Sequence, residues 1–272
     1  MLLHKKQLPP DDLLLVVEAG NTTTSLAVFQ ADDLLEVFNA SSKELSGGNA
    51  FSEILQQILI KHPSLCHAAI CSVVPLLENR FREFLGRHLR GEVLTVSASL
   101  HLPFILHYVS PASFGTDRLA LCAMSQYLYP EKAVIAIDIG TAITVDVLGS
   151  SQQYLGGLIM PGLDLMAKSL HEHTARLPLV PLDRPETLLG FSTADGIRNG
   201  IIHSCAASME GLIAKITRWL HETYGESDIR VLLTGGNAPF MAEMLDCALV
   251  VEQLAVVKGT HYLFCLNADL SD

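Results

Sequence analysis

The sequence predicts an α/β protein made of two similar halves. Apolar β-rich runs alternate with stretches in which apolar residues recur at helical spacing. Two β-rich runs, residues 13–29 and 133–149, share one pattern: a strand, an acid, a small or apolar residue, a glycine, hydroxyl-bearing positions and a second strand. Aligned on this pattern, Glu18 falls on Asp138, Gly20 on Gly140, Asn21 on Thr141 and Thr24 on Thr144.

Composition narrows the class of protein. The 272 residues give room for two modest domains or one large one. The net charge of −11 and the absence of a basic run argue against a nucleic-acid surface. No apolar run reaches the roughly 18–20 residues that span a bilayer. We therefore expect a cytoplasmic protein with a short frayed start and no membrane segment.

The six cysteines form no C-x-x-C pair, and most lie in apolar segments. This pattern favours free, buried thiols in a reducing compartment. The high apolar fraction of 49% indicates a large core and leaves room for a subunit interface.

Elements of the first half follow in order from apolar periodicity. A hairpin is expected at residues 13–29, a helix at 49–61, a strand at 68–74, a helix at 78–89 and a strand at 93–96. Residues 108–118 are rich in turn formers, and a helix is expected at 119–129.

The second half begins with the hairpin at residues 133–149. A turn is expected at Gly156–Gly157, and a helix within residues 161–178, closed by Pro178. A long amphipathic helix within 192–220, a strand at 231–234 and a glycine turn at 235–236 leading into another helix complete the pattern. No low-complexity linker separates the halves, so we expect domains at residues 12–113 and 114–270.

The two hairpin turns are the strongest functional signal. An acidic turn that contains glycine exposes backbone N–H groups and hydroxyls that can hold a phosphate, with a carboxylate beside them to recruit a cation. The alternative is a pair of ordinary β-hairpins in which Asn and Gly only make the turn. The occurrence of two such turns favours an enzyme that binds a nucleotide triphosphate in a cleft.

Asp117 is the most suggestive single carboxylate, because it precedes a helix at the expected domain junction. Arg118 beside it could pair with the carboxylate of a small acidic substrate or with a protein carboxylate. Thr193 could cap a helix or contact a ligand.

Three further features have weaker interpretations. Asp146 has no assigned role, and an alternating strand could point it to solvent. The glycines of Thr234-Gly-Gly-Asn-Ala238 could admit an adenosine or only shape the turn. His171 and His173 are two residues apart and point about 200° away from each other on a helix, so we do not expect them to bind zinc together.

Ordered motifs along the chain resemble those of type III pantothenate kinase, within the superfamily of acetate kinase, sugar kinases, Hsp70 and actin. The matching stretches cover most of residues 13–262. They are EAGNT at 18–22, ICSVVP at 70–75, YVSP at 108–111, GTDR at 115–118, DIGTA at 138–142, GGLIMPG at 156–162, TARLP at 174–178, ST at 192–193 and TGG at 234–236.

The resemblance implies two ribonuclease H-like (actin-like ATPase) domains with mixed sheets around a central cleft. It also implies ATP-dependent phosphorylation of pantothenate to 4′-phosphopantothenate, the first step of coenzyme A biosynthesis. The expected companions of the reaction are Mg²⁺ and a monovalent cation, potassium or ammonium. The expected assembly is a homodimer.

The resemblance also assigns roles to individual residues. Asp117 is the expected general base, and Asp138 is the expected ligand of the monovalent cation. ATP contacts are expected from Glu18, Ala19, Gly20, Asn21, Thr22, Thr23, Thr24, Ser25 and Thr141. Pantothenate contacts are expected from Tyr108, Gly115, Thr116, Asp117, Arg118 and Thr193.

One residue departs from the family pattern, because the first loop normally begins with aspartate and this chain has Glu18. The extra methylene moves the carboxylate by about 1.5 Å, and a displacement of about 1 Å can cost on the order of 100-fold where positioning is the catalysis. Glu18 therefore leaves open a non-catalytic regulatory or accessory relative that keeps the nucleotide cleft. A separate alternative is a different kinase or phosphatase of the superfamily.

Overall fold

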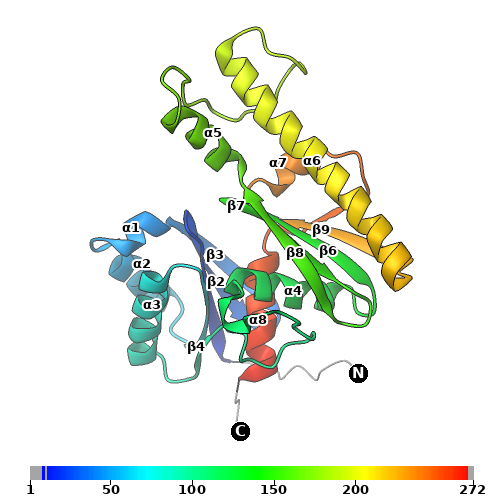
Figure 1. The fold of residues 1–272 in the computed structure, drawn as a ribbon. Coiled ribbons are helices and arrows are strands. Elements are labelled where there is room, and N and C mark those ends of the chain that lie inside the picture. The colour runs from blue at the N-terminus through cyan, green and yellow to red at the C-terminus, as the bar shows by residue number, and fades with distance from the viewer. Residues whose placement is uncertain (1–7, 10, 269–272) are drawn as a thin grey trace. The chain divides into compact units, whose positions relative to one another are not determined.

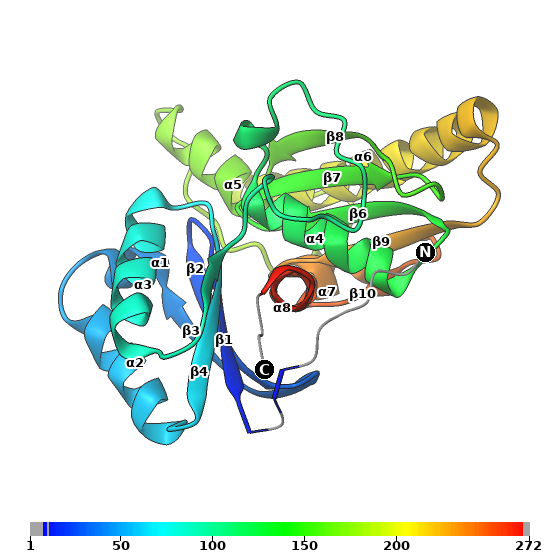
Figure 2. The same ribbon diagram turned by 90° about the horizontal axis from the view of Figure 1, so that it is seen from below.

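Residues 8, 9 and 11–268 are described by a computed structural model of the chain. Their contacts divide the chain into two compact units (Figures 1 and 2). The first unit comprises the residues up to Leu128 together with those from Ala255 onward, and the second is Tyr129–Leu254. The expected frayed start falls at the beginning of the chain, where residues 1–7 and 10 lie outside the described residues.

A mixed five-stranded sheet forms the centre of the first unit. Its strands are β1 (Leu13–Ala19), β2 (Thr23–Gln30), β3 (Asp33–Ser41), β4 (Leu65–Ser72) and β5 (Val93–Thr95), in the order β3-β2-β1-β4-β5. β1 pairs antiparallel with β2 and parallel with β4. The ends of β1 and β4 that carry Ala19 and Ser72 therefore lie side by side.

Helices cover both faces of this sheet. The helices α1 (Ser42–Ser46), α2 (Ala50–Lys61) and α3 (Pro75–His88) pack on the face that presents Leu15 and Val17 (Figure 1). The helices α4 (Thr116–Leu128) and α8 (Ala255–Asn267) contact β4, and α8 also contacts β1.

α4 and α8 pack closely together at Gly259. A Cβ atom on Gly259 would collide with the carbonyl oxygen of Ala120. α4 lies in the second expected domain, but this packing makes it part of the first unit. The compact units therefore divide the chain after Leu128 and after Leu254, and not between residues 113 and 114.

The second unit is built on another mixed sheet. Its strands are β6 (Ala133–Ile139), β7 (Ala142–Leu148), β8 (Tyr154–Pro161), β9 (Ile229–Thr234) and β10 (Val250–Val251), in the order β10-β9-β6-β7-β8. The helices α5 (Leu163–Glu172), α6 (Thr193–Tyr224) and α7 (Ala238–Ala242) share a core with one face of it, which presents Ile135, Ile137 and Val145.

The two sheets repeat one topology. Each begins with three antiparallel strands, and the first of these pairs in parallel with the fourth, which pairs in parallel with the fifth. β1 and β6 even share the same burial pattern, with only the acidic position, Glu18 or Asp138, partly exposed. The predicted fold class, two mixed-sheet α/β domains, is confirmed.

Two expectations about the second half are wrong. Gly156–Gly157 is not a turn, since both residues lie within β8, where Gly156 adopts a φ of +139° beside a register shift in the β7 pairing. The helix that begins at Leu163 ends at Glu172, six residues before Pro178. His173 caps it, its N–H donating to Ser169 O, and the chain leaves the helix there.

The six cysteines are free, as the sequence predicts, and four of them are buried. Within the described part of the chain, no helix is long and apolar enough to cross a membrane.

Candidate active site

A serine of α1 forms hydrogen bonds with the first acidic turn. Gly20, Asn21 and Thr22 join β1 to β2, and the Gly20 N–H donates to Thr23 O at 3.0 Å. The buried Ser42 hydroxyl donates to Gly20 O at 2.6 Å and lies 2.8 Å from the Thr24 hydroxyl. These contacts hold the turn in one conformation and leave Asn21, Thr22 and Thr23 exposed.

Thr24 was expected among the ATP contacts, but its side chain is fully buried and bonded to Ser42. Its hydroxyl therefore acts inside the turn. Ser25, the next residue, donates its hydroxyl to Asn39 Oδ1 on β3 at 3.0 Å.

Glu18 and Asp117 both lie near the end of β4. Glu18 is opposite Cys71 in the parallel pairing of β1 and β4, so the two side chains share a face of the sheet. Thr116, at the start of α4, donates its hydroxyl to Ser72 O at 2.9 Å, and its side chain also contacts the Cys71 thiol. Burial, with the charges of Asp117 and Glu18, raises the pKa of Cys71, so the thiol between the two carboxylates stays neutral.

Burial raises the pKa of the Asp117 carboxyl group above its ordinary value. The Arg118 N–H, which donates to Asp117 Oδ1 at 2.8 Å, and the Arg118 charge oppose this shift only in part. A Cβ atom on Gly115 would stand 2.5 Å from the same carboxylate oxygen, so a larger residue there would displace the Asp117 carboxylate. A carboxylate that is half removed from water and of raised pKa is suited to accept a proton.

A row of aromatic contacts supports Arg118. The Arg118 guanidinium carbon lies 4.4 Å from the centre of the Phe114 ring, and Tyr108 meets that ring edge-on at 4.9 Å. Arg118 is only 7% exposed, which is unusual for an arginine and indicates a fixed guanidinium group. The structure thus brings Tyr108, Gly115, Thr116, Asp117 and Arg118 together around the start of α4.

The second acidic turn is surrounded by glycines that permit a close approach of the backbone. A Cβ atom on Gly162 would collide with Gly140 O, and one on Gly235 would collide with Asp138 Oδ1. Gly235 also has a φ of +94°, which strains other residues. A larger residue at position 162 would therefore displace the backbone of the turn, and one at position 235 would displace the Asp138 carboxylate and the Ile139 backbone.

The two turns differ by one residue. In the first hairpin Glu18 pairs with Ser25 and Ala19 with Thr24, whereas in the second Asp138 pairs with Thr144 and Ile139 with Ile143. The alignment of Thr24 with Thr144 is therefore wrong, and the counterpart of Thr144 is Ser25.

The residues around Asp138 fit a cation. Asp138 supplies a carboxylate, and Thr144, directly across the strand pair, supplies a hydroxyl on the same face. The Thr144 oxygen is buried and has no hydrogen-bond partner within the described residues. Since leaving a buried hydroxyl unpaired costs about 1–3 kcal/mol, this oxygen is available to a cation at Asp138.

The structure decides two alternatives that the sequence leaves open in the second unit. Asp146 is fully buried rather than exposed to solvent, and Tyr154 donates its hydroxyl to Asp146 Oδ1 at 3.0 Å. The N-cap of α6 is Ser192, which accepts from the Asp195 N–H at 3.1 Å, and Thr193 is the first helical residue.

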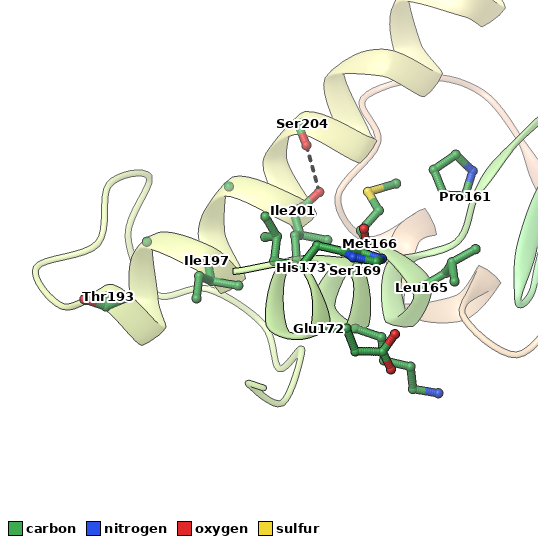
Figure 3. Close-up of a pocket in the computed structure, with 14 residues that line it drawn as sticks. Pro161, Leu165, Met166, Ser169, Glu172, His173, Thr193, Ile197, Ile201 and Ser204 are labelled. Carbon is green, nitrogen blue, oxygen red and sulfur yellow. Dashed lines mark hydrogen bonds between the residues drawn. The ribbon is translucent and has the colours of Figure 1, made fainter. Parts of the chain in front are cut away.

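Thr193 lines a cavity of about 950 Å³ between α5 and the first turns of α6 (Figure 3). Most of its lining is apolar, from residues such as Leu165, Met166, Ile197 and Ile201. Sequence reasoning did not predict this cavity.

Asp12, Cys66 and His67 form a cluster that sequence reasoning also missed. His67 Nδ1 accepts the Glu92 N–H at 3.0 Å, so the proton of the neutral ring resides on Nε2, which faces Asp12 at 3.4 Å. Both ring nitrogens are thus occupied, and the arrangement ties the start of β1 to β4.

Two sheets of one topology, each with an acidic glycine turn after its first strand, define the actin-like ATPase fold that sugar kinases share. Comparison with solved structures agrees with this class. A Listeria monocytogenes protein described as a candidate N-acetylmannosamine kinase matches 93% of this chain and 98% of its own at a TM-score of 0.50 and 12% identity. A Campylobacter jejuni protein described as a candidate Baf family transcriptional activator matches 92% and 96% at a TM-score of 0.54 and 20% identity. At these identities the likeness concerns the fold alone.

Sequence comparison is more specific. The family model for type III pantothenate kinase matches residues 14–215. A type III pantothenate kinase of Chlorobium luteolum is 47% identical over 259 residues, which cover 95% of this chain and 96% of that protein. The chain belongs to the type III pantothenate kinase family.

Proposed function

We propose that the protein transfers the terminal phosphoryl group of ATP to pantothenate, giving ADP and 4′-phosphopantothenate. Membership of the family supports this reaction. The observation that carries the proposal is the position of Asp117, a partly buried carboxyl group of raised pKa in the first turn of α4. It lies close to Cys71, which is opposite Glu18 at the end of β1, and the turn that follows β1 has exposed residues.

Asp117 is the proposed general base. Phosphoryl transfer passes through a loose transition state, so the acceptor alcohol loses its proton late, as its oxygen bonds to phosphorus. A carboxylate held by the Arg118 N–H can accept that proton without a strongly basic pKa. Arg118, fixed against Phe114, is proposed to pair with the pantothenate carboxylate, together with contacts from Tyr108, Gly115 and Thr116.

The acidic turns are proposed to bind ATP and its cations. The turn at residues 20–22 offers its exposed groups to phosphate oxygens, with Glu18 placed to reach Mg²⁺ through a water. Thr141 is proposed as a further ATP contact. Asp138 is proposed to hold a monovalent cation, potassium or ammonium, whose charge would offset that of the phosphates.

A homodimer is proposed from the apolar surface of the second unit. The cavity between α5 and α6 is open and largely apolar, and Leu188, Leu189 and Phe191 nearby in sequence are more than two-thirds exposed. Such surfaces mark interaction sites in most proteins. A cytoplasmic location is proposed because ATP and six free thiols suit a reducing compartment.

The proposal is tested by release of ADP in a coupled assay. Purified protein with ATP, Mg²⁺, potassium and pantothenate is expected to release ADP, and omission of pantothenate is expected to abolish the signal. Asp117→Asn is expected to lower kcat by at least about 100-fold while circular dichroism stays unchanged, because a general base contributes about 10²–10⁴ in rate. Equal turnover of this variant would remove Asp117 from its proposed role.

Glu18→Asp is the companion variant in the same assay. Faster turnover of Glu18→Asp would show that the longer side chain holds its carboxylate away from the best position. Turnover by neither form, with ATP binding intact, would favour a regulatory relative over a kinase.

A further inference from the structure

Thr144 is the one buried hydroxyl beside an acidic turn that the described residues leave without a hydrogen bond. It is 9% exposed and lies on the face of β7 that carries Asp146, directly opposite Asp138 of β6. Directly opposed residues of an antiparallel pair have Cβ atoms about 4.5–5.5 Å apart. The hydroxyl and the Asp138 carboxylate therefore belong to one small polar site.

The first unit shows how the protein satisfies a hydroxyl at the equivalent position. There the counterpart of Thr144 is Ser25, opposite Glu18, and its hydroxyl donates to Asn39 on the neighbouring strand β3. The counterpart of Asn39 in the second unit is Ile159, opposite Thr144 on β8. An isoleucine side chain cannot accept a hydrogen bond, so the repeat keeps the hydroxyl and lacks the neighbour that would satisfy it.

We propose that the Thr144 hydroxyl oxygen is a direct ligand of the cation held at Asp138. The inference rests on the proposed function, which places a monovalent cation there, and adds a neutral oxygen ligand to it. A carboxylate provides one charge and a hydroxyl provides a lone pair without charge, and such oxygen donors suit hard cations. The free lone pairs of a buried, unbonded oxygen are available for this contact.

A second threonine, on the other side of Asp138, differs from Thr144 in its contacts. Thr234 of β9 is opposite Asp138 on its other side, and its hydroxyl donates to Gln253 O at 3.2 Å. Thr234 is therefore satisfied by the protein, and Thr144 is not. The two threonines that flank Asp138 are thus distinguishable by their contacts.

The test measures cation binding without nucleotide or pantothenate. The full-length protein is dialysed against a choline chloride buffer and titrated with potassium chloride, with the melting temperature as readout and further choline chloride as the ionic-strength control. Thr144→Val keeps the side-chain shape and removes the hydroxyl. We expect its melting temperature without potassium to equal or exceed that of the wild type, and its midpoint for potassium to rise about tenfold.

Two control variants separate ligand binding from stability. Thr144→Ser keeps the oxygen and is expected to keep the midpoint within about threefold. Val145→Ala removes volume from the opposite, apolar face of the same strand, where Val145 is buried, and is expected to lower the melting temperature with an unchanged midpoint.

The inference is overturned if Thr144→Val has the same potassium midpoint as the wild type. It is also overturned if this variant melts at a lower temperature than the wild type before potassium is added. Asp138→Asn separates this failure from that of the proposed function. If Asp138→Asn weakens potassium binding and Thr144→Val does not, the cation site stands and Thr144 is not its ligand. If neither variant changes the midpoint, or the wild type does not respond to potassium, both proposals fail at this place.

Discussion

A partly buried carboxyl group such as Asp117 gains reactivity at the expense of stability. Its pKa is raised in the folded protein because burial penalises the charged form. The protonated group therefore contributes stability that is present below the unfolded pKa and is lost as the pH rises through the folded pKa. At neutral pH the ionised Asp117 destabilises the fold.

The destabilisation by ionised Asp117 predicts how Asp117→Asn changes the stability at different pH values. The neutral amide is expected to raise the free energy of unfolding at pH 7.5, and the gain is expected to shrink as the pH falls toward the ordinary carboxyl range, where the wild-type group becomes neutral too. Urea unfolding at pH 7.5 and at pH 4.5 measures both values. The acid limb of kcat/KM in the wild type is expected to lie above the range of an unperturbed aspartate.

A lower stability of Asp117→Asn at pH 7.5 would contradict this account. It would mean that the contacts of the carboxylate with Arg118 outweigh its burial.

Single residues also set the limit of what the sequence predicts about the site. The GTDR stretch indicates Asp117 because an acid at the expected domain junction would have access to a cleft. Ser42 gave no such signal, since it acts on Gly20 across 22 residues of chain, and only the β2–β3 hairpin brings the two together. Asp146 was left open because an alternating strand does not reveal which of its faces is covered.

At the scale of elements, the two β-hairpins were predicted well because both strands of each are strongly apolar and flank a distinctive turn. β3 was missed because its residues are partly exposed throughout and include Asp33 and Glu36. α8 was missed for the opposite reason. It is buried on nearly every side, so it lacks the polar stripe by which an amphipathic helix is found.

The α4–α8 contact is the element on which the position of Asp117 depends. Gly259→Ala would place a methyl group against the backbone of α4 at Ala120, which cannot move without displacing the helix. We expect this change to lower the free energy of unfolding by about 1–3 kcal/mol, as overpacking does. It is also expected to lower kcat, because it displaces the helix that carries Asp117, and to change the affinity for ATP less. Urea unfolding and the ADP assay measure the two effects.

Gly86→Ala is the matched control within the same unit. Gly86 lies on α3 with open space where the methyl group would stand, so alanine is expected to stabilise the helix by about 0.5–1 kcal/mol. If Gly259→Ala behaved like Gly86→Ala, the close packing of α4 and α8 would not constrain the site.

On the scale of the whole molecule, the two units share one sheet topology, and each has an acidic turn after its first strand. This repeat explains why the sequence contains two acidic turns of similar form. The repeat was visible in the sequence because its signal lies in local strands and turns. The apolar cavity was not visible, because Leu165 of α5 and Ile201 of α6 are 36 residues apart and meet only through packing.

That cavity yields a prediction about assembly. Leu165 lines it and is 44% exposed, so an acidic side chain there is compatible with folding and incompatible with an apolar interface. Leu165→Asp is expected to convert a dimer of about 59 kDa, twice the chain mass of 29.5 kDa, into a monomer in light scattering after gel filtration. Leu76→Asp, at a 55% exposed position on α3, makes the same chemical change outside the cavity and is expected to leave the mass unchanged. Dimers that persist in Leu165→Asp and dissociate in Leu76→Asp would contradict this prediction and would move the interface to the first unit.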